Sequence, residues 1–423
     1  YLCRPETDAR GEETVPSVFL SFLRGRLGEI PCRRLEAGEF LPEEPAGAWD
    51  EEGARARLLV DLFWREVPAG EEAAVLALYE RYRTAVAELL RRTTPRPLEG
   101  TDLPPAVAAD LEERFGPARI MATSVLEDYA TCPFLFLARR IWRLEEEREV
   151  EEDPEGTVLG QAYHVALEHF FRRCDGPLSR EKLPFYERLL AAAVAEAFTP
   201  LMEGARTEAA KHLWTVARTT CAITLRRLLA AEIRRNEDFG PSRVLHGELG
   251  FGLPKQAAAD PASSSLPLVL GEGELRLSGK IDRVDLLADG HYAIYDYKLG
   301  RVPASSAVLE GKALQISLYL LAGRRIFFPE LAPAGAGYYS LRDLTRQNGL
   351  WRASLAAVTG INPRTRGSLA EEEWEATLAR LEEEALAAAR RLRAGDFRPL
   401  PPGEECPSYC PFPRVCRREV AAG

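Results

Sequence analysis

The sequence lacks long apolar runs and an export signal. No uninterrupted apolar stretch reaches the ~18 residues that a membrane-spanning helix needs. Residues 1–5 do not resemble a signal peptide, and the chain does not begin with methionine. We therefore expect a cytoplasmic chain with no membrane partner, and we expect it to be a piece of a longer protein.

Positive charge is also in deficit. The 423 residues include 55 Lys and Arg against 65 Asp and Glu, and the resulting net charge of −10 disfavours, taken alone, a nucleic-acid ligand. Arginines nevertheless gather in short clusters, which together could line a channel for phosphates. The clusters are Arg139–Arg140 with Arg143, Arg172–Arg173, Arg226–Arg227, Arg234–Arg235, and Arg414 with Arg417–Arg418. Any one cluster alone is typical of a solvated helix face.

A phosphate-binding loop of the Walker type is missing as well. Gly279 and Lys280 have the right spacing, but Ile281 stands where such a loop needs Ser or Thr. Glu274 stands where the loop needs its first Gly. The sequence therefore argues against ATP hydrolysis by this chain alone.

The eight cysteines lack the pairing pattern of a secreted protein, and without an export signal we do not expect disulfides. Cys3, Cys32, Cys174 and Cys221 are isolated, and we expect free thiols there.

A second group of cysteines predicts a metal cofactor. Cys406, Cys410 and Cys416 are bunched in the tail, and Cys132 is the best candidate for a fourth ligand. Four thiolates suit zinc or an iron–sulfur cluster. One distant and three close ligands favour a [4Fe-4S] cluster that staples the two ends of a domain together. A zinc site stays the alternative.

Composition and periodicity predict an α/β fold with a packed core, since 46% of the residues are hydrophobic and 28% are charged. Residues 1–117 read as a helical segment and residues 118–423 as a second domain, with a proline-rich linker near residues 95–105. Helices are expected over residues 18–27, 71–92, 157–170, 183–198, 208–235, 313–321 and 371–392, and from Ser124 toward Cys132. Strands are expected over residues 244–250, 274–279, 281–287, 292–297 and 337–340, and the charged run 145–152 as an exposed connection.

The strands at residues 281–287 and 292–297 are expected to form a hairpin, whose turn length decides which side chains meet. A two-residue turn would place Asp282 and Asp296 on opposite faces, because strand side chains alternate. A three-residue turn, with Gly290 in the left-handed conformation at its third position, would place the two acids directly opposite each other. We expect the three-residue form.

The three-residue form also separates the two faces of the hairpin by polarity. One face would hold both acids, Lys298 and an apolar floor for packing helices. That floor consists of Val284, Leu286, Tyr292 and Ile294. The other face would carry Arg283, Asp285 and His291, and we expect it to meet solvent or a loop.

The acidic face predicts a divalent-metal site. Mg²⁺ prefers hard oxygen ligands, which Asp282, Asp296 and the backbone carbonyl of Tyr297 would supply. A divalent ion can acidify a water for attack on phosphorus and neutralise charge on the phosphoryl oxygens. Lys298 can stabilise the same charge or position the water. The pattern predicts phosphodiester hydrolysis, although residues 296–298 alone are typical of an exposed pair in an ordinary hairpin.

Three polar residues outside the hairpin are candidates for the same site. His164 could complete the shell of Mg²⁺ or, more readily, of Mn²⁺. Gly160, four residues earlier, would allow DNA to approach closely. Gln315 and Tyr319 share one helix face, and we expect them to contact a phosphate or the water at the metal. Taken singly, each is equally typical of an ordinary amphipathic helix.

In their order along the chain, these motifs resemble those of a known family. The order is Ser124-x-Leu126-x-x-Tyr129-x-x-Cys132-Pro133-Phe134, Gly160-x-x-x-His164, Gly279-x-x-Asp282-Arg283, Asp296-x-Lys298, Gln315-x-x-x-Tyr319 and the cysteine-rich tail. Residues 120–418 resemble the RecB-type branch of the PD-(D/E)xK nucleases, in the iron–sulfur version found in the AddB component of bacterial AddAB helicase–nucleases. The first two tail cysteines are spaced C-x3-C, where the family usually has C-x2-C.

The resemblance implies a central mixed sheet flanked by helices, here with large helical insertions. It implies that His164, Asp282 and Asp296 are metal ligands, that Lys298 is the catalytic lysine, and that Gln315 and Tyr319 form an accessory motif. It implies that Cys132, Cys406, Cys410 and Cys416 hold the cluster. The implied activity is Mg²⁺-dependent exonucleolytic degradation of DNA, at a single-stranded end or an unwound duplex, during the repair and recombination of broken ends beside an AddA-like subunit.

Two other interpretations stay open. A CRISPR-associated nuclease with the same cluster is disfavoured because the helical insert and the first hundred residues would be surplus. A catalytically idle scaffold that binds DNA and a partner is disfavoured because Asp282, Asp296 and Lys298 are all present.

Overall fold

The computed structural model describes residues 105–144, 156–254, 260–401, 404, 406–407 and 409–416. These residues belong to a compact unit that begins at Arg96. The helices expected within residues 1–100, the charged run 145–152, Cys3, Cys32 and Arg417–Arg418 lie outside the described residues. The domain boundary after residue 117 therefore stays a prediction.

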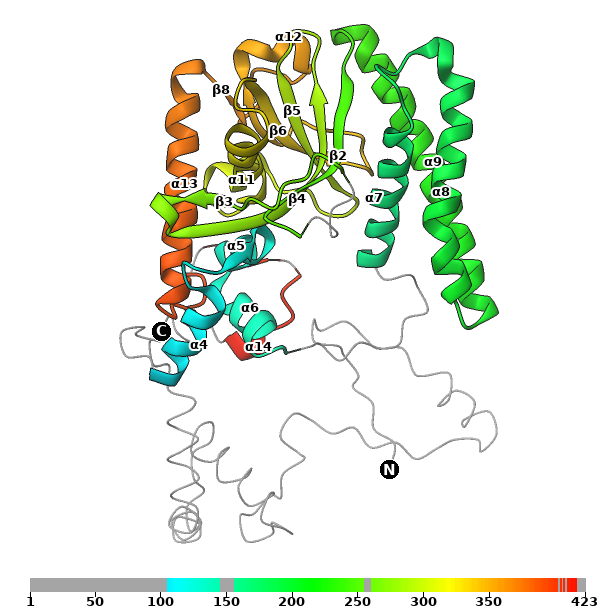
Figure 1. Cartoon of the computed structure of the whole chain (residues 1–423). Helices are drawn as coiled ribbons and strands as arrows, with labels where there is room; N and C mark the ends of the chain where they lie inside the picture. Colours follow the sequence, from blue (N-terminus) through cyan, green and yellow to red (C-terminus); the bar gives the residue numbers. More distant parts are fainter. Residues whose placement is uncertain are drawn as a thin grey trace, which may run out of the picture. The chain divides into compact units, whose positions relative to one another are not determined.

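A mixed sheet lies at the centre of the described residues (Figure 1). Its strands follow the order β1-β4-β5-β6-β7-β8, and β2 and β3 also pair with β4. The strands are β1 Ile120–Ala122, β2 Arg243–Phe251, β3 Leu268–Leu270, β4 Leu275–Leu286, β5 Tyr292–Lys298, β6 Pro333–Ser340, β7 Gly349–Arg352 and β8 Ser368–Leu369. The pairs β1–β4, β5–β6 and β7–β8 are parallel, and the other pairs are antiparallel.

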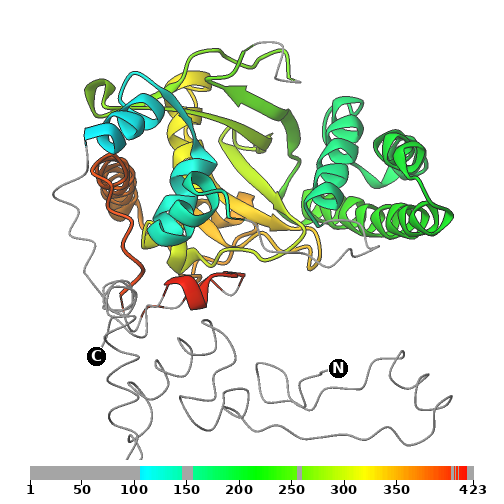
Figure 2. The same cartoon turned by 90° about the horizontal axis from the view of Figure 1, so that it is seen from below.

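Helices cover both faces of this sheet. One side carries α11 and α13 with α4 and α5, whereas α7, α8 and α9 stand together on the other side, as Figures 1 and 2 show. The helices are α4 Pro105–Phe115, α5 Thr123–Thr131, α6 Pro133–Phe136, α7 Gly156–Arg172, α8 Leu183–Gly204, α9 Glu208–Phe239, α10 Ser305–Leu309, α11 Gln315–Ala322, α12 Ala356–Thr359, α13 Glu371–Arg393 and α14 Pro413–Cys416. The α/β class, with a mixed sheet between helices, is confirmed.

Strand β5 shows how the sequence produces two hydrophobic cores. Tyr292 and Ile294 pack into the cluster under α11 and α13, whereas Ala293 and Tyr295 pack into the cluster under α7, α8 and α9. All four side chains are fully buried. Successive strand side chains point to opposite faces, so a strand covered on both faces needs apolar residues at every position.

The expected elements match the structure in kind, with one difference in the sheet. The strands expected at residues 274–279 and 281–287 form one continuous strand, β4. A Cβ at Gly279 would lie 2.7 Å from the ring of Phe251 on the neighbouring strand. Glycine therefore admits the close approach of this ring inside the strand and does not end it.

The three-residue turn of the hairpin is confirmed. The Leu287 N–H donates to the His291 carbonyl at 2.8 Å, and the Gly290 N–H donates to the Leu287 carbonyl at 3.1 Å. Gly290 has a φ of +88°. The register continues to the pair Arg283–Tyr295, so that Asp282 and Asp296 follow as the next opposed positions.

The expectation that the reverse face of the hairpin meets solvent is wrong. Arg283 and Asp285 are buried, because α7, α8 and α9 cover this face. Arg283 Nε and Nη2 donate to the two oxygens of Asp285 at 2.6 and 2.7 Å, and Nη2 also contacts Glu232 of α9 at 2.5 Å. Paired in this way, the charges can be buried without losing their hydrogen-bond partners.

Candidate active site

Three side chains from three elements converge beside the hairpin. His164 of α7, Glu248 of β2 and Asp282 of β4 place their ligand atoms within 4.8 Å of one another. His164 Nδ1 lies 3.5 Å from Asp282 Oδ1 and 3.5 Å from Glu248 Oε1. An imidazole nitrogen with carboxylate oxygens is a donor set that suits Mg²⁺ and, more readily, Mn²⁺.

The carboxylates around His164 hold a positive charge on the ring. Burial works to lower the pKa of His164, but Asp282 and Glu248 outweigh it and raise the pKa to about 10. The site thus attracts a proton at neutral pH. A divalent cation would satisfy the same carboxylates more fully, because it carries twice the charge.

Asp282 and Asp296 flank the next part of the site. The Tyr297 N–H donates to Asp282 Oδ2 at 2.7 Å, which fixes the carboxylate across the strand pair. Burial raises the pKa of Asp296, and the charge of Asp282 adds to the shift, against the opposing charge of Lys298.

Asp296 keeps an oxygen that the protein does not satisfy fully. Its Oδ2 lies 2.7 Å from Lys298 Nζ, yet the alignment is poor and this buried oxygen accepts no hydrogen bond. Buried polar atoms normally have a partner. This orphaned oxygen beside Asp282 therefore fits a bound divalent ion.

Lys298 begins a short chain of hydrogen bonds. Its Nζ donates to Gln315 Oε1 at 3.2 Å, and Gln315 Nε2 donates to Tyr319 Oη at 2.8 Å. Burial works to lower the pKa of Lys298, but Asp296 and other acids outweigh it and raise the pKa. The structure thus brings Gln315 and Tyr319 to a charged lysine.

Tyr297 connects the two faces of β5. Its phenol lies on the reverse face, where the hydroxyl accepts from Arg283 Nη1 at 3.4 Å. The ring packs edge-on against His164, with centroids 5.9 Å apart. The role of its backbone carbonyl as a metal ligand stays a prediction.

Sequence reasoning missed Glu248. This residue has a φ of +56° inside β2 and is 4% exposed, and its carboxylate also pairs with Lys280. A non-glycine residue in this region of φ is costly and often marks a functional site. The one signal in the sequence is an acid inside an otherwise apolar strand.

Glu127 of α5 was missed as well. Its Oε2 accepts a hydrogen bond from the Gln315 N–H at 2.6 Å. Burial raises the pKa of Glu127 to about 7, against the Gln315 hydrogen bond and the charge of Lys298. The signal in the sequence is an acid between Leu126 and Tyr129, which are both buried.

The structure gathers three of the four expected cluster ligands. Cys132, Cys410 and Cys416 pack into one small group with Phe134, Leu135, Ala138 and Phe412. Cys132 Sγ accepts a hydrogen bond from the Leu135 N–H at 3.5 Å, whereas Cys406 is exposed. No three thiols of the described residues lie within 4.8 Å of one another.

The isolated cysteines of the described residues, Cys174 and Cys221, are free thiols, as expected. Burial raises the pKa of each to about 12. Both therefore stay protonated and unreactive at neutral pH.

Most of the arginine clusters pair with nearby acids. Arg140 pairs with Asp128, Arg172 with Glu168, Arg173 with Glu196, and Arg234 with Asp238. Arg235 is buried and donates to the Val358 carbonyl at 2.9 Å. These contacts favour the structural interpretation for the paired arginines.

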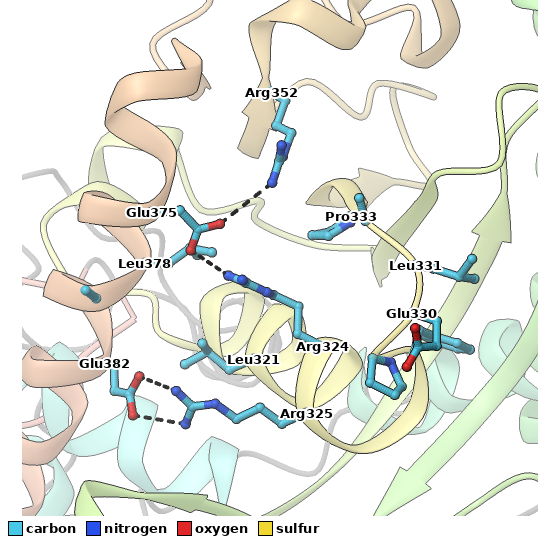
Figure 3. A pocket seen from close by; sticks show the side chains of 14 residues that line it. Leu321, Arg324, Arg325, Glu330, Leu331, Pro333, Arg352, Glu375, Leu378 and Glu382 are labelled. Atoms are coloured by element: carbon cyan, nitrogen blue, oxygen red, sulfur yellow. Dashed lines mark hydrogen bonds and ion pairs between the residues drawn. The ribbon is translucent and has the colours of Figure 1, made fainter.

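A pocket of about 600 Å³ lies between the turn Gly323–Phe327 and α13, and none of the predicted site residues lines it. Figure 3 shows that its charged groups already face one another. Arg325 Nη2 donates to Glu382 at 2.6 Å, and Arg324 Nη1 donates to Glu375 at 2.9 Å. The pocket has no unpaired charge that would point to a ligand among these pairs.

No helix in the described part of the chain combines the length and the apolarity that a bilayer crossing demands.

Comparison with known proteins agrees with this geometry. The family model described as PD-(D/E)XK nuclease superfamily matches residues 121–417. The chain is also similar to proteins whose name makes each of them one component of an ATP-dependent helicase/deoxyribonuclease. That of Moorella thermoacetica is 28% identical over 390 residues, which cover 82% of this chain and 30% of the relative.

Two further relatives carry the same name. That of Desulforudis audaxviator is 30% identical over 252 residues, which cover 56% of this chain and 20% of the relative. That of Carboxydothermus hydrogenoformans is 29% identical over 359 residues, which cover 81% of this chain and 30% of the relative. The chain thus spans less than a third of the length of these three relatives.

Proposed function

The chain belongs to the PD-(D/E)XK nuclease superfamily, and we propose that residues 118–423 form a divalent-metal-dependent deoxyribonuclease domain. The observation that carries the proposal is the convergence of His164 and Asp282, with Asp296 and Lys298 following in the same hairpin register. The name shared by the relatives adds support for DNA as the substrate.

The metal that fits this donor set is Mg²⁺ or Mn²⁺. His164, Asp282 and Asp296 would hold it, together with the Tyr297 carbonyl, and Glu248 stands close enough to join them. When bound, such an ion supplies an acidified water and offsets the charge that grows on the phosphoryl oxygens.

The protein's own residues would orient the substrate and balance its charge. Lys298 carries an ammonium that can contact a phosphoryl oxygen, and Gln315 holds that ammonium at 3.2 Å. A Cβ at Gly160, one turn before His164, would meet no atom within 4 Å. This open space supports the approach of a DNA backbone beside the imidazole.

The cysteines support a [4Fe-4S] cluster held by Cys132, Cys406, Cys410 and Cys416. Cys132 at the end of α5 packs with Cys410 and Cys416 from the tail. Backbone N–H groups point at the Cys132 sulfur, as they do at thiolates that ligate iron. The cluster would close the domain and take no part in the chemistry.

The cellular role that fits these features is exonucleolytic processing of double-strand DNA ends in the cytoplasm. The relatives' name contains both a helicase and a deoxyribonuclease. We infer that this chain works in an AddAB-type assembly, beside an AddA-like subunit that delivers single-stranded DNA.

The test is digestion of DNA by the purified chain. We expect Mg²⁺ or Mn²⁺ to allow degradation of linear DNA but not of closed circles, and we expect chelation or Asp296→Ala to abolish it. Asp238→Ala, which removes an acid from the surface of α9, serves as the matched control. A wild-type chain that leaves linear DNA intact with both metals contradicts the proposal.

A further inference from the structure

Glu127 lies one hydrogen bond away from the residues that hold Lys298, although the proposed reaction gives it no role. It is on α5, the helix that ends at Cys132. Its carboxylate reaches across to the first residue of α11, Gln315, at 2.6 Å. Two segments that are 188 positions apart in the sequence meet here.

The local sequence leaves the start of α11 without a cap. The first N–H groups of a helix have no partner within the helix, and a side chain at the N-cap usually accepts one of them. The N-cap of α11 is Leu314, which has no side-chain acceptor. Glu127 supplies the missing acceptor from another helix, and its carboxylate also suits the positive end of the helix dipole.

A second residue of α5 reinforces this grip. Thr123 lies one turn before Glu127, so that the two side chains share a face of the helix. Thr123 is 3% exposed, and its hydroxyl is hydrogen-bonded to that of Tyr319. Helix α5 thus holds both Gln315 and Tyr319, the two residues whose hydrogen bonds lead to Lys298.

We propose that Glu127 is a positioning residue, which fixes the start of α11 and, through the side chain of Gln315, the ammonium of Lys298. The proposal rests on the proposed function. It assigns no contact between Glu127 and the substrate. Without this hydrogen bond the first turn of α11 would fray, and Lys298 would lose the fixed acceptor that aims it at the phosphate.

The experiment compares three variants of the full chain. Glu127→Ala removes the acceptor. Glu127→Gln keeps an oxygen that can accept from the Gln315 N–H. Asp128→Ala removes the neighbouring carboxylate of α5, which pairs with Arg140 on the surface.

For Glu127→Ala we expect kcat to fall by about 10- to 100-fold, while KM for DNA stays within about twofold, because a misplaced group costs rate and not binding. Glu127→Gln should recover most of kcat, and Asp128→Ala should match the wild type. Wild-type kcat in Glu127→Ala overturns the proposal. Glu127→Gln that is as slow as Glu127→Ala, while melting like the wild type, overturns it too.

Amide hydrogen exchange separates this proposal from the proposed function. The Gln315 amide should exchange faster in Glu127→Ala and regain its protection in Glu127→Gln, whether or not the chain cuts DNA. Equal protection in the wild type and in Glu127→Ala overturns the positioning role. An inactive wild type with this exchange pattern would overturn the nuclease proposal alone.

Discussion

Asp296 and Lys298 determine each other's charge. Asp296 is buried deeply enough for its pKa to rise, and Lys298 is the cation that opposes this rise. The same carboxylate keeps Lys298 protonated against the effect of burial. Either residue alone would be an uncompensated charge in a dry site, so we expect them to act as a pair.

The first prediction concerns the two acids of the hairpin. Asp282→Asn and Asp296→Asn should each lower the rate of DNA cleavage by about 10³-fold or more, because a lost ligand removes the charge stabilisation at the phosphate. DNA affinity should change little, since neither acid attracts the phosphate backbone. Single-turnover cleavage and fluorescence anisotropy measure the two quantities. Cleavage by Asp296→Asn within tenfold of the wild type would count against the site.

Spacing alone identified the residues that belong to short motifs. His164, Asp282, Asp296, Lys298, Gln315 and Tyr319 could be singled out because each stands in a recognisable pattern. Glu248 could not be found in this way, because its contact with His164 depends on a left-handed residue inside a strand. Glu127 was missed because its partner is a backbone N–H far along the chain.

At the scale of elements, the hairpin shows what strand geometry can and cannot predict. Turn length fixes the register, so the opposition of Asp282 and Asp296 followed from the sequence. Burial of the reverse face did not follow, because it depends on where the helices of the insert pack. Alternation along a strand tells which side chains share a face but not what covers it.

The buried charges of that reverse face join the helical insert to the sheet. Arg283 of β4 contacts Glu232 of α9 as well as Asp285, and the Tyr339 hydroxyl of β6 donates to Glu232 at 2.9 Å. Burial alone would raise the pKa of Glu232, but the charges of Arg283 and Arg346 hold it well below its usual range. The network therefore stabilises the fold only while Glu232 is ionised.

The second prediction follows from this burial. Arg283→Met should lower the free energy of unfolding by about 3–5 kcal/mol, because Asp285 and Glu232 would be left as buried charges without their partner. The urea midpoint, followed by circular dichroism, reports this loss. Arg180→Met is the matched control, since Arg180 pairs with Glu237 on the surface, and its midpoint should stay close to that of the wild type.

The third prediction concerns acid. A carboxyl with a depressed pKa contributes stability that is complete above its ordinary pKa, about 4.5, and is lost as the pH falls toward the pKa of the folded state. The difference in urea midpoint between the wild type and Glu232→Gln should therefore be constant above about pH 5 and shrink below it. A difference that stays the same down to pH 3 would show that Glu232 does not titrate as described.

At the scale of the whole molecule, the two ends of the described residues meet at the cysteines. Cys132 follows α5, and Cys410 and Cys416 lie beyond α13, yet all three pack into one group. Linking positions so far apart removes conformations from the unfolded chain, and this favours the folded state. Because α5 also holds α11, loss of the link should reach the catalytic residues.

The fourth prediction tests this link. Cys132→Ser should lose iron, labile sulfide and visible absorbance, and its melting temperature and nuclease rate should both fall. Cys174→Ser, which changes an isolated thiol of the helical insert, should keep all four properties. A colourless wild type that contains zinc, or a Cys132→Ser chain with full iron content, would refute the cluster.

The global fold was predictable because the motifs occur in a recognisable order, and because two strand patterns fixed the centre of the sheet. The outer strands β1, β3, β7 and β8 were not predicted. Each spans two to four residues, too few for alternation to be visible in the sequence. Their pairing depends on the long strand β4 and on β6, which only tertiary contacts bring alongside.

Anomalous diffraction from crystals grown with Mn²⁺ tests most directly whether the carboxylates form a metal site. The account predicts an anomalous peak in contact with His164, Asp282 and Asp296, and its loss in crystals of Asp282→Asn. Saturating Mn²⁺ with no peak between these side chains would contradict it.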